Sequence, residues 1–115
     1  MPPPPERRHS SRLKLKVPVE IHVEGASAPL RGATSDISML GCYIESMYPF
    51  PVGTQLELKL DITSTLLVLG EVITSDPQVG NGIQFVRMLP EDIAELRVFL
   101  ESAEKKSADA AGQAT

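Results

Sequence analysis

Apolar and polar side chains alternate along much of this chain, which is the pattern of half-buried β-strands. Between Leu13 and Val23 every second residue is apolar, and most of the residues between them are charged or polar, which predicts one long strand. Pro18 falls on the polar side of that strand and indicates an edge or a bulge there. The same alternation, separated by turn residues, predicts five more strands at residues 30–37, 41–45, 56–61, 65–74 and 81–87. Six short strands with turns between them predict an antiparallel β-barrel or sandwich.

A change of period after the last strand predicts a closing helix over residues 90–103. Pro90 and the acidic pair that follows it suit a first helical turn. Ile93, Leu96, Phe99 and Leu100 share one face at a spacing of 3.6 residues, so this amphipathic helix should pack on the barrel.

The remaining segments lack such a pattern. Residues 1–5 form a stiff, proline-rich tail, residues 6–12 form a charged segment that we expect to be mobile, and residues 104–115 are small and polar and are predicted to be disordered. The folded domain is therefore expected at residues 6–103, with the barrel at residues 13–87.

The length and the charge of the chain limit the classes of function that it can have. A chain of 115 residues that is 42% hydrophobic makes one domain. Its net charge of −4 argues against a general nucleic-acid binder. The basic residues are nevertheless uneven, since five of the eleven fall within ten positions, at Arg7, Arg8, Arg12, Lys14 and Lys16. This cluster predicts a local site for an anionic ligand on an acidic protein.

The stretch Asp36-Ile37-Ser38-Met39-Leu40-Gly41 supplies a polar counterpart to the arginines. On a strand, residues two apart share a face, so the Asp36 carboxylate and the Ser38 hydroxyl should point the same way. Gly41 can adopt φ > 0 and lacks a Cβ, so it permits a tight turn or a close approach by a ligand. We expect a small polar shelf at the edge of a sheet. The alternative, that Asp36 and Ser38 merely cap the turn, stays open.

Arginine and aspartate together fit a purine nucleotide. Arg8 and Arg12 lie four residues apart, so both could reach one ligand, and their forked donors suit phosphate oxygens or the O6/N7 edge of guanine. Asp36 could accept hydrogen bonds from the N–H groups of a guanine Watson–Crick edge.

These two motifs, Arg8-x-x-x-Arg12 and Asp36-x-Ser38-x-x-Gly41, resemble the two-part signature of the PilZ domain, the bacterial receptor module for cyclic di-GMP. The resemblance extends over residues 6–103 and includes Gly53, Gly70-Glu71-Val72, Gly82-Ile83-Gln84-Phe85 and the closing helix. It implies a six-stranded antiparallel split barrel with a C-terminal amphipathic helix.

The resemblance also implies roles for single residues. Arg8 and Arg12 would contact phosphates and guanine edges, Asp36 and Ser38 would hold guanine and phosphate, and Gly41 would keep the turn open. In the family, an arginine at the position of Arg7 is associated with two mutually intercalated ligand molecules. The number of ligand molecules per domain, one or two, therefore stays open. Ligand binding would order the N-terminal segment and relay the signal to an unidentified downstream effector protein.

Other functions find less support in the residues. Cys42 and two scattered histidines give no metal-ligand spacing, and Cys42 reads as a small buried hydrophobe. His22 lies on the polar face of a strand and should be solvated, and His9 falls in the arginine segment. We therefore expect no enzyme, no metal and no cofactor. With no signal-like leader and no apolar run of the ~18 residues that a membrane span needs, the chain is expected to be cytoplasmic.

Two other classes of protein are alternatives to a receptor. A PilZ fold without nucleotide binding could act as a protein docking module, as some members tied to type IV pili do, but those generally lack the motif residues present here. A barrel that binds single-stranded nucleic acid would need aromatic stacking platforms, and this chain has 4% aromatic residues and no tryptophan.

Overall fold

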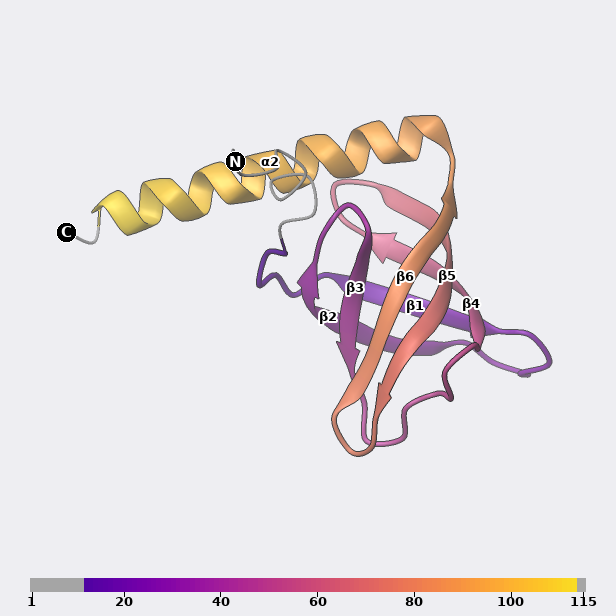
Figure 1. Ribbon diagram of the computed structural model, residues 1–115. Coiled ribbons are helices and arrows are strands. Elements are labelled where there is room, and N and C mark those ends of the chain that lie inside the picture. Colours follow the sequence, from indigo (N-terminus) through magenta and orange to yellow (C-terminus); the bar gives the residue numbers. More distant parts are fainter. Residues whose placement is uncertain (1–11, 114–115) are drawn as a thin grey trace, which may run out of the picture.

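The computed structural model describes residues 12–113, and the side chains of residues 12–106. Six antiparallel strands close into a barrel in the order β1-β2-β3-β6-β5-β4, and one helix follows them (Figure 1). This confirms the predicted fold class. The elements are β1 (Pro18–Val23), β2 (Leu30–Ile37), β3 (Gly41–Glu45), β4 (Gln55–Asp61), β5 (Thr65–Asp76), β6 (Gly80–Met88) and α2 (Pro90–Gln113).

The core fills the barrel with the inward-facing residue of each alternating pair. Leu56, Leu58 and Leu60 of β4 are each at most 2% exposed, and the charged residues between them face outward. Helix α2 adds Leu96 and Leu100, both buried, to the same cluster. The predicted apolar face of the helix therefore does pack on the barrel, which it covers at one end (Figure 1).

The first strand is shorter than predicted, because the segment before Pro18 is irregular. Leu13 pairs with Ile37 as an isolated bridge, whereas Pro18 pairs with Ala33, so the segment is one residue longer than the part of β2 that it faces. The buried hydroxyl of Thr34 bridges this bulge: it accepts the Val17 N–H at 2.9 Å and donates to the Leu15 carbonyl at 2.7 Å. The bulge indicated by Pro18 is present just ahead of it.

The helix is longer than predicted. It runs to Gln113, so its predicted end at Ala103 was wrong, and residues 104–113 are helical rather than disordered. Alanine, glutamate, lysine and glutamine have high helix propensity, and the small, polar composition of this stretch concealed that preference. The C-terminal half of α2 projects past the barrel (Figure 1). The predicted proline-rich tail and all of the arginine segment except Arg12 lie outside the described residues.

Candidate functional site

The predicted polar motif lies at the β2–β3 turn, on the outer wall of a closed barrel rather than at a sheet edge. Strand β2 ends at Ile37, so Ser38 belongs to the turn. The Ser38 N–H donates to the Gly41 carbonyl at 2.8 Å, and the Ser38 hydroxyl accepts the Leu40 N–H at 3.0 Å. Ser38 is 1% exposed. At this exposure Ser38 is not part of an exposed polar shelf; it closes the turn, as the capping alternative held for it.

Gly41 is required by the approach of another strand. A Cβ at this position would lie 2.2 Å from the carbonyl oxygen of Ile83 in β6, far inside van der Waals contact. The positive-φ glycines of the described chain are Gly25, Gly53 and Gly80, so at Gly41 the missing Cβ matters rather than a positive φ. The Phe85 N–H donates to the Leu40 carbonyl at 2.8 Å and fixes β6 against the turn. Gly41 thus lets β6 pack closely on the motif.

Asp36 meets Arg12 on the outer face. One Arg12 guanidinium nitrogen lies 2.6 Å from a carboxylate oxygen of Asp36, with the two side chains 44% and 31% exposed. Backbone pairing sets up this contact, because Leu13 and Ile37 exchange N–H···O bonds of 2.9 and 3.0 Å. Residues 24 positions apart are thereby brought together. Arg7, Arg8 and His9 lie outside the described residues.

Tyr43 is a neighbour that the sequence reasoning did not single out. It is the cross-strand partner of Asp36, and its hydroxyl donates to Asp76 at 2.7 Å. Burial and this bond to a carboxylate raise the pKa of Tyr43 to about 12, so it remains a donor at neutral pH. The signal was available, because Tyr43 alternates with the inward-facing Cys42 and so had to face outward near the motif.

Behind this surface, Cys42 is fully buried, as predicted for a small core residue. Burial raises the pKa of its thiol to about 12; the Arg12 guanidinium opposes this rise and the Asp36 carboxylate adds to it. A thiol held neutral is a poor nucleophile and a poor metal ligand. Within residues 12–113 there is no group of three or more potential metal-ligating side chains.

A second charged cluster lies on β1, β2 and β4. His22 is not simply solvated as expected, since its Nε2 lies 2.8 Å from Glu20. This contact lowers the pKa of the Glu20 carboxyl. Arg31 and Lys59 stand 3.7 and 3.8 Å from the same carboxylate. All four residues sit on barrel strands, unlike Arg12, which precedes the barrel.

Among the described residues, α2 is not apolar enough along any stretch of sufficient length to cross a membrane.

Comparisons with known proteins agree with this fold. A family model described as the PilZ domain matches residues 6–102. The crystal structure of the PilZ domain of CeSA from a cellulose-synthesizing bacterium superposes with a TM-score of 0.63 at 21% identity, covering 82% of this chain and 99% of that one. The Bacillus subtilis inhibitor of motility (MotI/DgrA) superposes with a TM-score of 0.69 at 18% identity, and the match covers 93% of this chain and 56% of that one. No curated protein matches this chain.

Proposed function

Because this chain belongs to the PilZ domain family, we propose that it is a cyclic di-GMP receptor that relays ligand binding to a partner protein in the bacterial cytoplasm. The observation that carries the proposal is the contact between Arg12 and Asp36. It brings a phosphate- and guanine-binding donor next to a guanine-binding acceptor on an accessible wall. In this account the protein acts as a binding module rather than as an enzyme.

Ligand binding replaces one set of contacts with another. An exposed ion pair such as Arg12–Asp36 typically contributes only about 0–1 kcal/mol, so both groups can be released to the ligand at small cost. Arg12, together with Arg8 and Arg7, then binds phosphate and guanine edges through forked, charge-assisted hydrogen bonds. Asp36 accepts the N–H groups of a guanine. These bonds must offset roughly 1–2 kcal/mol for each residue of the arginine segment that is fixed.

Ser38 and Gly41 serve the site by shaping the turn. Ser38 is buried and bonded to Leu40 and Gly41, so its hydroxyl positions the backbone next to Asp36. Gly41 keeps β6 in contact with the turn. This division assigns direct contact to the arginines and Asp36.

The proposed relay runs through the segment that follows Arg12. This segment is tied to β2 through the Leu13–Ile37 bridge and the Thr34 hydroxyl, and its Leu15 lines the same groove as residues of α2. Fixing Arg12 on a ligand would therefore constrain a segment that borders the helix groove. A partner that reads this region would sense occupancy of the site as a shift in conformational populations.

Isothermal titration of the purified protein with cyclic di-GMP, with GTP and cyclic GMP as controls, tests the proposal. We expect saturable binding that is selective for the dinucleotide. A stoichiometry of two ligands per protein would support the role suggested for Arg7, and a stoichiometry of one would contradict that role. No heat at high ligand concentration would overturn the receptor proposal and favour the docking module.

Arginine substitutions test the assigned roles. We expect Arg8→Ala and Arg12→Ala each to lower the affinity at least tenfold, about 1.4 kcal/mol, while the circular dichroism of the barrel stays unchanged. Arg31→Ala is the matched control, since Arg31 is exposed on β2 and faces Glu20 instead. Unchanged affinity in both motif variants would contradict the assignment.

A further inference from the structure

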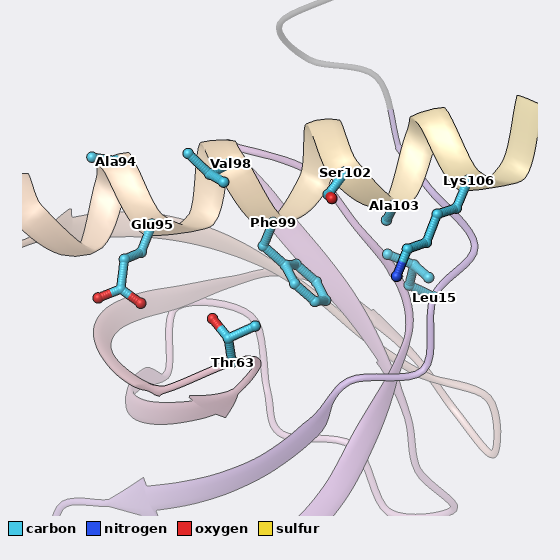
Figure 2. Close-up of a pocket in the computed structure, with 9 residues that line it drawn as sticks. All are labelled: Leu15, Thr63, Ala94, Glu95, Val98, Phe99, Ser102, Ala103 and Lys106. Carbon is cyan, nitrogen blue, oxygen red and sulfur yellow. The ribbon is translucent and has the colours of Figure 1, made fainter.

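A groove runs along one side of α2, outside the nucleotide site. It has a volume of about 800 Å³ and lies between the helix and the end of the barrel. Leu15, ahead of β1, and Thr63, in the β4–β5 turn, line the side opposite the helix, and Phe99 points from the helix toward Thr63 (Figure 2). The groove is open to solvent and mostly apolar, so it can accept an apolar surface from another molecule.

The helical wall of the groove allows a second helix to approach closely. Its middle carries Val98, Ser102 and Ala103, and Val98 is 65% exposed. Small side chains allow a second helix backbone to come near, and the distance between packed helix axes depends on the side chains at the contact. An isolated helical stretch shorter than about 12–15 residues is marginally stable in water. The projecting half of α2 would therefore gain stability from a partner helix.

Opposite charges mark the two ends of this wall. Glu95, whose carboxylate accepts a hydrogen bond from the Ser64 hydroxyl of its own chain, lies near one end and Lys106 near the other, on the same side of the helix (Figure 2). If a second α2 lies antiparallel in the groove, Glu95 of each copy faces Lys106 of the other. Phe99 of each copy then lies level with Ser102 of the other. The wall is therefore complementary to itself, which is the requirement of a two-fold symmetric interface.

We propose that this groove holds α2 of a second copy of the chain, forming an antiparallel, two-fold symmetric dimer. The occupant is a second copy because reversing the helix pairs both of its charged ends at once. A helix of unrelated sequence would have no reason to match them. The proposal does not depend on nucleotide binding.

Sedimentation velocity of the full chain, without ligand, tests this directly. We expect a dimer at tens of micromolar, and Val98→Glu should weaken the dimer at least tenfold because it places a charge in the apolar centre. Val86→Glu is the matched control: Val86 is 62% exposed on β6, away from the groove, and its substitution should leave the dimer unchanged. A monomeric parent chain, or a Val98→Glu variant that dimerises like the parent, would overturn the proposal.

Charge reversal tests the register and does not rely on a core substitution. Glu95→Lys and Lys106→Glu should each weaken the dimer at least fivefold, because each places like charges together twice. The double variant should return to within about twofold of the parent affinity. If the double variant stays as weak as the single ones, the antiparallel register is wrong, and a helix-binding partner of another sequence becomes the explanation for the groove.

Discussion

The barrel wall at the β2–β3 turn has an inner face and an outer face, which differ in burial and in the contacts that hold them. On its inner side, Ile37, Ser38 and Cys42 are at most 1% exposed and are held by packing and by bonds within the turn. On its outer side, Arg12 and Asp36 are partly exposed and hold each other through one ion pair. The inner face is buried, whereas the outer contact is an exposed ion pair of a kind that contributes little to stability.

This difference divides a short motif into two parts. Asp36 lies on the wall and is available, while Ser38 and Gly41 set the shape that presents it. In the proposed site, the motif would therefore contain residues that shape the turn without touching the ligand. Substitutions on the inner side should lower stability first, and substitutions on the outer side should lower affinity alone.

Gly41→Ala should give the largest effect. Because the new methyl group would fall 2.2 Å from the Ile83 carbonyl oxygen, β6 must move, and we expect unfolding to become easier by at least about 3 kcal/mol. Urea denaturation measures this. Gly32→Ala is the control, since its nearest heavy atom would be an ordinary contact at 3.8 Å, and it should change stability by less than about 0.5 kcal/mol. Equal stability of both variants would refute the role given to Gly41.

Ser38→Ala should come next. It removes the acceptor of the part-buried Leu40 N–H, and losing a hydrogen bond of this kind costs about 0.5–1.5 kcal/mol. Thermal denaturation should show this loss, and ligand affinity should fall with it because the turn loosens. Ser35→Ala, which removes only a 3.4 Å bond to the Tyr43 carbonyl, serves as the control. A Ser38→Ala variant with parent stability and reduced affinity would instead place Ser38 in direct contact with the ligand.

Asp36→Asn should separate binding from stability. The amide cannot accept two guanine N–H groups as the carboxylate does, so we expect cyclic di-GMP affinity to fall about tenfold. The melting temperature should barely change, because an exposed ion pair contributes little. Asp61→Asn, on β4 and remote from the turn, should alter neither quantity. A large loss of stability in Asp36→Asn would show that the outer face is structural as well.

Alkaline pH offers a further test of the inner face. The folded-state pKa of Cys42 is raised by burial from 9.0 to about 12, so the thiol binds its proton more tightly in the folded state. Its contribution is fully present below pH 9 and is lost as the pH rises toward 12. Replacing Cys42 with alanine should make the fall in stability over that window shallower.

Tyr43→Phe is the control for this measurement, because Tyr43 titrates in an overlapping range on the outer face. Its substitution should leave the part of the fall that belongs to Cys42 in place. If the Cys42→Ala variant loses stability with pH as steeply as the parent, the thiol is not the group responsible.

Much of the fold followed from local pattern. Leu56, Leu58 and Leu60 alternate with charged residues, and alternation alone predicts which side of β4 is buried. The sequence predicted that Arg12 and Asp36 belong to one ligand site. It did not predict that the two side chains contact each other. Their actual contact depends on the bridge between Leu13 and Ile37, which no local pattern specifies.

Long-range geometry explains what was missed. The Ser38 hydroxyl bonds within the turn because β2 ends at Ile37, so strand alternation does not set its direction. The need for glycine at position 41 arises from Ile83, more than forty residues later in the chain, so the turn itself gives no sign of it. The helix end was misplaced for a local reason, because a composition typical of tails outweighed good helix propensity over residues 104–113.

A ¹H–¹⁵N NMR titration with cyclic di-GMP tests the central claim most directly, because it reports both binding and its location. We expect saturable shifts at the arginine segment, at Asp36 and its turn, and at Tyr43, with the side-chain Nε–Hε signal of Arg12 among those that move. The signals of the strands that carry Glu20 and Lys59 should not shift. No shifts, or shifts confined to residues far from Asp36, would contradict the assignment of this wall as the ligand site.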